Sequence, residues 1–245
     1  MRKLVTSLCA AVCLFLCGKQ AKAEDLTQGL MVAVPTLEGK APTIDGLLED
    51  WDLSAAEPMW ITPQTADRFH GKVALMYDDK ALYFSAQVSL PGRPLVNRNN
   101  PVDPFWNGDM LELRLVTDPD VAWPVRADAE NVKTNRRVVH CSVWRNSETG
   151  KDYLSLVYGV RLNLGKSVNP EGSQVVIRTD ADRGYVAEVR IPWSALNVPG
   201  GRNPFPPGQR MTATTAIHWG GETQVSALYR VNPGSFAFRR PESWG

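Results

Sequence analysis

The fold class of this chain is indicated by one stretch, Val73-Ala74-Leu75-Met76-Tyr77-Asp78-Asp79-Lys80-Ala81-Leu82-Tyr83-Phe84. Residues 72–76 and 81–88 are apolar-rich runs of strand length. The polar residues 77–80 separate them, and such a short polar link between two apolar runs predicts a β-hairpin.

The same pattern of apolar runs and polar links recurs along the rest of the chain. Residues 110–117 place three leucines on one face of a strand and Glu112 with Arg114 on the other, because side chains alternate across a strand. Further strands are predicted at 138–144, 153–164, 174–178, 185–191 and 211–219. Because no three-turn helix is indicated, we predict an all-β protein, an antiparallel β-sandwich of the immunoglobulin or jelly-roll type with about eight to ten strands.

The composition excludes several classes of protein. Of 245 residues, 43% are hydrophobic and 22% are charged, which is typical of a globular chain and not of a disordered one. The formal net charge of +1 provides no basic field for nucleic acid. No apolar segment follows the N-terminal one, so we expect a protein that is not embedded in a membrane.

The N-terminus has the pattern of a secretory signal peptide. Arg2 and Lys3 precede an apolar run at 4–17, and Ala21-Lys22-Ala23 resembles a cleavage site. We therefore expect a signal peptide at 1–23 and a single domain at 24–245, exported to the periplasm or the extracellular space. Cleavage would leave Cys141 as the only cysteine, so no intramolecular disulfide is expected.

Nucleophilic catalysis is not indicated. His140 and Cys141 are adjacent, and neighbours on a strand point to opposite faces, so they cannot form a dyad. We expect Cys141 to be a buried structural residue. The nucleophile pattern G-x-S-x-G is absent.

A pair of carboxylates for glycoside hydrolysis was weighed against a structural role. Glu112 and Glu188 both lie on outward strand faces, and glycosidases need two carboxyl groups in one cleft. Each glutamate has an arginine two residues further along its strand, Arg114 or Arg190. Surface ion pairs are therefore the preferred interpretation, and we expect no enzyme activity.

Tryptophan is the strongest signal for a ligand. All eight tryptophans follow the signal peptide, and several occur in segments rich in Pro, Gly and Asn, such as 104–108, 122–124 and 218–221. A single loop aromatic commonly covers the core, but several together suggest a surface on which sugar rings stack.

Four ordered segments then carry a resemblance to a known family: Thr43-Ile44-Asp45-Gly46 through Trp51, Val73–Phe84, Trp106-Asn107-Gly108-Asp109 through Leu113, and Tyr185–Trp193. In order and spacing they resemble the family 9 carbohydrate-binding modules and the wider DOMON-like β-sandwich group. The resemblance implies that Trp106 stacks on a sugar and that Glu112 hydrogen-bonds to its hydroxyls.

The resemblance also implies a second stacking residue and a metal site. The family's second stacking tryptophan is matched best by Tyr229, in a late segment that also contains Asn232, and Trp219 is the alternative. The resemblance also implies a structural calcium ion, for which Asp45 and nearby acids are candidates. The histidines show no metal-binding spacing of their own.

The leading expectation is a non-catalytic, exported carbohydrate-binding protein that acts in polysaccharide catabolism beside co-secreted glycoside hydrolases. A second reading is a DOMON-like electron-transfer protein with b-type haem, because some relatives use Met or His ligands. The residues considered for that role are Met76, Met110, Met211, His140 and His218. A third reading is a structural or interaction sandwich whose sugar site has decayed.

Overall fold

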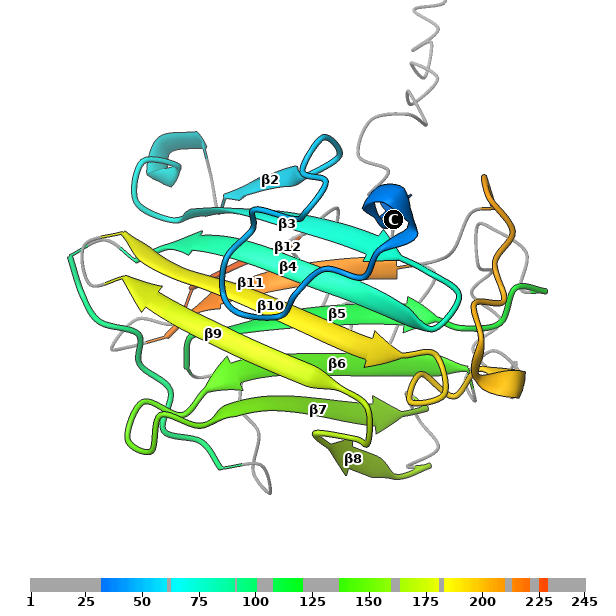
Figure 1. The fold of residues 1–245 in the computed structure, drawn as a ribbon. Helices are drawn as coiled ribbons and strands as arrows, with labels where there is room; N and C mark the ends of the chain where they lie inside the picture. Colours follow the sequence, from blue (N-terminus) through cyan, green and yellow to red (C-terminus); the bar gives the residue numbers. More distant parts are fainter. Residues whose placement is uncertain are drawn as a thin grey trace, which may run out of the picture.

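Two six-stranded sheets pack face to face (Figure 1). The computed structural model describes residues 32–60, 63–90, 92–100, 108–120, 137–159, 164–180, 183–209, 213–220 and 225–228. The first sheet comprises β1 (Ala33–Pro35), β2 (Glu57–Trp60), β3 (His70–Tyr77), β4 (Ala81–Ser89), β9 (Gln174–Asp180) and β10 (Gly184–Pro192). The second comprises β5 (Met110–Val116), β6 (Val138–Arg145), β7 (Asp152–Tyr158), β8 (Lys166–Val168), β11 (Ala213–Trp219) and β12 (Val225–Leu228).

The strand order interleaves distant parts of the chain. The first sheet runs β1-β3-β4-β10-β9, with β2 also paired to β3, and the second runs β12-β11-β5-β6-β7-β8. All pairs are antiparallel except β1 with β3. The predicted β-sandwich is therefore confirmed, and so is the hairpin that joins β3 to β4.

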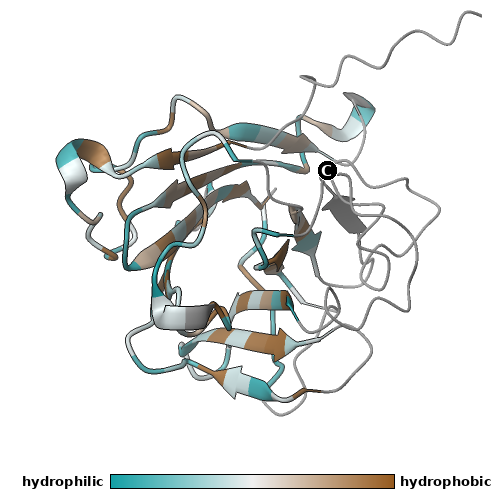
Figure 2. Cartoon of the chain, turned by 90° about the vertical axis from the view of Figure 1, so that its right-hand side faces the viewer, coloured by the Kyte–Doolittle hydropathy of each residue, from teal (hydrophilic) through white to brown (hydrophobic). Residues whose placement is uncertain are grey.

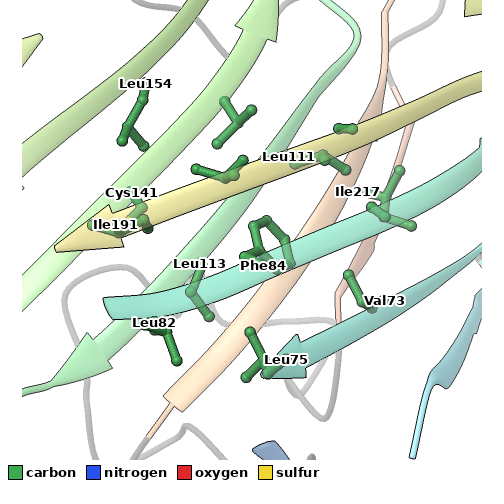
Figure 3. Packing of buried hydrophobic residues seen from close by; sticks show 14 of the residues in the cluster. Val73, Leu75, Leu82, Phe84, Leu111, Leu113, Cys141, Leu154, Ile191 and Ile217 are labelled. Carbon is green, nitrogen blue, oxygen red and sulfur yellow. The ribbon is translucent and has the colours of Figure 1, made fainter. Parts of the chain in front are cut away.

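The core lies between the sheets. Alternate residues of a strand point to opposite faces, and Figure 2 shows brown and pale bands alternating along several strands. Figure 3 shows Phe84, Leu75 and Val73 of the first sheet facing Leu113 and Ile217 of the second. These side chains are at most 3% exposed, and Cys141 is fully buried among them, as predicted.

The predicted strands differ from the observed ones mainly at their ends and in number. The strand predicted at 153–164 is β7, which ends at Tyr158. The next residue, Gly159, has a φ of +73°, a backbone conformation that residues other than glycine rarely adopt. The short strands β1, β2, β8 and β12 were not predicted. The described residues contain no α-helix, only 3-10 turns at Leu37–Gly39, Pro63–Thr65 and Pro199–Gly201, and thus no helix able to cross a membrane.

A second, smaller apolar cluster covers the outer face of the first sheet. Trp51 packs with Met76 and Tyr83, and Ile44 and Leu48 lie against them. The segment 42–56 therefore crosses the outside of this sheet, where Figure 1 shows it as a blue loop in front of the strands.

Glu188 holds that segment in place. Its fully buried carboxylate accepts the backbone N–H groups of Asp45, at 2.9 Å, and Gly46, and the indole N–H of Trp51 at 2.6 Å. The ion pair expected with Arg190 is wrong, because Arg190 donates to the carbonyl of Gly172 instead. Burial raises the pKa of Glu188, and the three donated hydrogen bonds oppose that rise.

Asp78 plays a similar role at the β3–β4 turn. Its carboxylate accepts the backbone N–H groups of Lys80 at 2.7 Å and Ala81 at 2.8 Å, and the hydroxyl of Tyr83 at 2.8 Å. Its carbonyl accepts the indole N–H of Trp193 at 2.9 Å. The second and fourth segments of the family resemblance are thus bonded to each other, which shows that their polar residues secure the fold.

Candidate functional site

A cluster of ionisable side chains lies on the outer face of the second sheet, opposite the core. Glu112 and Arg114 project from β5, His140 from β6 and His218 from β11. Their neighbours Leu111, Leu113, Cys141 and Ile217 point inward, so alternation places the four polar groups on the other face. We call these four residues the Glu112 cluster.

The strand register brings the cluster together. β5 lies between β6 and β11, so Glu112 has neighbours on both sides. Arg114 stands opposite His140, Glu112 stands opposite both Ser142 and Ala216, and His218 stands opposite Met110. Cross-strand neighbours are close enough for their side chains to interact, which makes Glu112 the centre of the group.

All three basic side chains approach the Glu112 carboxylate. His140 Nε2 lies 3.1 Å from Oε1, His218 Nε2 lies 3.3 Å from Oε2, and the Arg114 guanidinium donates to Oε2. The side chains of Glu112 and Arg114 are 5% and 3% exposed, and His218 is 6% exposed. His140 is the most accessible member, at 14%.

The electrostatics of the cluster favour an ionised glutamate. Burial alone would raise the pKa of Glu112, but His140, His218 and Arg114 together hold that pKa well below its usual range. Burial lowers the pKa of Arg114, and the Glu112 carboxylate opposes that change. The expected ion pair between Glu112 and Arg114 is confirmed, but it is buried and not a surface pair.

Asp109 anchors the start of β5 beside this cluster. Its carboxylate accepts two hydrogen bonds from Arg93, at 2.7 and 2.6 Å, and the backbone N–H groups of Val96 at 2.7 Å and Gly220 at 2.9 Å. One side chain thereby joins the segment 92–100, the start of β5 and the end of β11. The backbone directly after position 107 is held rigidly.

Trp219 does not lie on a binding surface. The side chain is fully buried in the core, donates its indole N–H to the Ser89 carbonyl at 2.8 Å, and contacts Phe69 edge-on with ring centroids 5.8 Å apart. The prediction that Trp219 stacks on a sugar is therefore wrong, because neither face of the indole is accessible. Trp106, Tyr229 and Asn232 lie outside the described residues.

The remaining described tryptophans also serve mainly to support the fold. Trp51, Trp144 and Trp193 are at most 5% exposed, and Trp60 on β2 is 44% exposed. Trp144 donates its indole N–H to the carbonyl of Asn99 at 3.1 Å. Most of the described tryptophans therefore serve the fold, and the abundance of tryptophan is not by itself a ligand signal.

The described residues favour none of three other chemistries, namely metal binding, haem binding and hydrolysis by paired carboxylates. The Asp45 carboxylate accepts the backbone N–H of Leu47 at 2.9 Å, and no group of three or more His, Cys, Asp or Glu suited to a metal occurs in this part of the chain. The histidines proposed for haem direct Nε2 toward Glu112. Glu112 and Glu188 lie on opposite outer faces of the sandwich, so these two carboxylates do not share a cleft.

The sequence reasoning missed the link between Glu112 and the two histidines. His140 and His218 are 28 and 106 positions from Glu112 and share no motif with it. Strand alternation did predict that Glu112 and His140 point away from the core side chains beside them. Only the register between β5 and its two neighbours brings the histidines to the carboxylate.

Comparison with solved structures identifies the same fold in two carbohydrate-related proteins. One is a family 9 carbohydrate-binding module from Caldicellulosiruptor kristjanssonii, solved with cellotriose; it is 21% identical, with a TM-score of 0.50 over 87% of this chain and 90% of that one. The other is a candidate carbohydrate-binding protein from Bacteroides uniformis, 10% identical, with a TM-score of 0.57 over 87% of this chain and 95% of that one. No family model and no curated relative matches the chain. The fold is thus that of a family 9-like carbohydrate-binding module.

Proposed function

We propose that this chain is a non-catalytic protein that binds a glycan on the outer face of the second sheet. The observation that carries the proposal is the Glu112 cluster, a buried polar group on the face of the sandwich that the core does not use. Buried ionic groups are costly, and replacing them with apolar residues is often neutral or stabilising, so their presence favours a functional role.

The chemistry of the cluster suits sugar hydroxyls. Imidazole and guanidinium groups donate hydrogen bonds, and a carboxylate accepts them. Glu112 holds its basic partners in fixed directions, so little entropy is lost when a hydroxyl replaces water beside them. Because His140 is the most accessible member, we propose that it meets the ligand first, with Glu112 and Arg114 behind it.

Sugar stacking is assigned in this proposal to Trp106 and Tyr229, with Asn232 as a further polar contact. In the sequence Trp106 lies three residues before Asp109, whose carboxylate accepts the backbone N–H groups of Val96 and Gly220. Aromatic faces packed against the C–H groups of a sugar would supply most of the binding energy, and hydrogen bonds from the Glu112 cluster would fix the orientation of the sugar.

The fold of the two solved proteins supports carbohydrate as the ligand class, since one of them holds cellotriose. Export by the signal peptide at 1–23 and a role beside co-secreted glycoside hydrolases in polysaccharide catabolism complete the proposal. The two outward glutamates face away from each other, which supports a binding role over hydrolysis.

The test is a titration of intrinsic tryptophan fluorescence with soluble glycans, cellotriose among them. We expect saturable quenching or a blue shift in the wild type, loss of the response in Trp106→Ala, and weakening of about tenfold or more in Glu112→Gln. Trp60→Phe is the matched control, because Trp60 is exposed on the first sheet. Absence of any response, or equal responses in all variants, would overturn the proposal.

A further inference from the structure

A hollow of about 420 Å³ opens at the edge of the sandwich, and no residue of the Glu112 cluster lines it. It is lined by Lys151, Asp152, Tyr153, Asn169, Ser173 and Val175, which belong to β7, β9 and the segments around them. This volume falls within the range of small-molecule sites. We call it the edge groove.

The frame of the edge groove is rigid. Arg145 donates two hydrogen bonds, of 2.6 and 2.8 Å, to the Asp152 carboxylate. The same carboxylate accepts the backbone N–H of Ile177 at 3.0 Å. Asn169 accepts the backbone N–H of Leu154 at 2.7 Å and donates to the carbonyl of Asp152 at 3.3 Å. Asp152 thus links the second sheet to β9 of the first, and the groove is formed before any ligand arrives.

One of the lining residues, Tyr153, has an aromatic ring that is held in place. Tyr153 is half-buried and packs against the buried Trp144, with ring centroids 5.2 Å apart and planes 31° from parallel. Among the described residues, the Tyr153 hydroxyl has no hydrogen-bond partner. A fixed ring with an available hydroxyl offers a sugar both a stacking surface and a polar contact.

The charge of the edge groove is positive. Asp152 is neutralised by Arg145, whereas the exposed Lys151 ammonium forms no ion pair within the described part of the chain. An ammonium group with no counter-charge attracts an anionic ligand group. An aromatic wall and hydrogen-bonding side chains beside it favour a saccharide over a bare anion.

We propose that the edge groove is a second glycan site, selective for a saccharide unit that carries a carboxylate. Lys151 pairs with that carboxylate, and Tyr153 packs against the ring and bonds a hydroxyl. The inference shares the ligand class of the proposed function but uses none of the residues of the Glu112 cluster. The two sites can therefore fail independently.

The test compares two probes, trigalacturonate and cellotriose, by calorimetric titration of the full protein. Lys151→Gln should weaken trigalacturonate binding about fivefold and leave cellotriose binding unchanged. Tyr153→Phe, which keeps the packing on Trp144, should weaken trigalacturonate binding about threefold. Lys72→Gln, an exposed lysine on β3, is the control that removes the same charge elsewhere.

Three results would overturn the proposal of a glycan site in the edge groove. The first is an absence of trigalacturonate binding to the wild type. The second is equal trigalacturonate binding by Lys151→Gln and Lys72→Gln. The third is a loss of trigalacturonate binding in Glu112→Gln with no loss in Lys151→Gln. Absence of any response to the glycans of the first test, cellotriose among them, with Lys151-dependent trigalacturonate binding intact, would instead reject the first site and keep the second.

Discussion

Glu188 of β10 accepts the indole N–H of Trp51 at 2.6 Å, across 137 residues of chain. With the backbone N–H groups of Asp45 and Gly46, this bond turns a segment without regular structure into the cover of the first sheet.

Replacing Glu188 with glutamine should therefore lower stability without touching a ligand site. The amide would keep one accepting oxygen but set an NH2 group against N–H donors, so we expect a loss of about 1–3 kcal/mol in the free energy of unfolding. Urea denaturation measures it. Glu49→Gln, an exposed change in the same segment, should leave the midpoint unchanged; an equal loss there would contradict the role given to Glu188.

The Glu112 cluster should give the protein a specific sensitivity to acid. Because the pKa of Glu112 is held below its usual 4.5 in the fold, the unfolded chain binds more protons as pH falls through that range. Its contribution to stability is therefore full at neutral pH and is lost as the pH falls below about 4.5 toward the lower folded value.

Glu112→Gln isolates that contribution. At neutral pH the substitution leaves Arg114 buried without its counter-charge, so we expect the free energy of unfolding to fall by about 3–5 kcal/mol. The difference in Tm between the wild type and Glu112→Gln, measured by thermal melts over a pH series, should become smaller as the pH is lowered. A gap that stays constant with pH would argue against an ionised Glu112.

Trp219 should matter for folding and not for sugar. Trp219→Phe removes the bond to the Ser89 carbonyl and part of a buried ring, which we expect to cost about 1–3 kcal/mol. At a temperature where the variant is fully folded, glycan affinity should equal that of the wild type. A selective loss of affinity would restore Trp219 as a ligand contact.

The close approach of Gly220 to Gly108 should tolerate no side chain. A Cβ atom at position 220 would lie 2.5 Å from the Gly108 Cα, and backbone cannot move aside cheaply. We expect Gly220→Ala to destabilise the protein by about 1–3 kcal/mol, seen as a lower Tm. An unchanged Tm would show that the junction fixed by Asp109 yields easily.

Cys141 should resist alkylation in the native protein. Burial raises the pKa of its thiol, and the side chain is fully enclosed between the sheets. Iodoacetamide should modify it only when urea is present, as peptide mapping would show. Labelling under native conditions at the rate of the unfolded chain would contradict this packing.

Local patterns predicted the parts of the fold that depend on neighbouring residues. The β3–β4 hairpin followed from two apolar runs and a polar turn, and the faces of β5 followed from alternation. Short edge strands such as β2 and β12 were missed because about four residues carry too little periodicity to stand out.

The candidate site could be predicted only in part, for a different reason. Glu112 was expected to point away from the core, but its partners come from strands on either side of β5, and the pairing register is not encoded near Glu112. The partners of Glu188 could not be predicted for the same reason, since the groups that it binds lie more than 130 positions earlier in the chain.

The interleaved strand order has a consequence for how the chain reaches its native state. β4 pairs with β10 and β5 pairs with β11, so each waits about a hundred residues for a partner. Such non-local pairing slows folding and leaves open edges that can associate with other chains. During synthesis neither sheet can be completed until β10 and β11 have emerged. The open strand edges of the nascent chain therefore stay exposed to aggregation until its last third has been made.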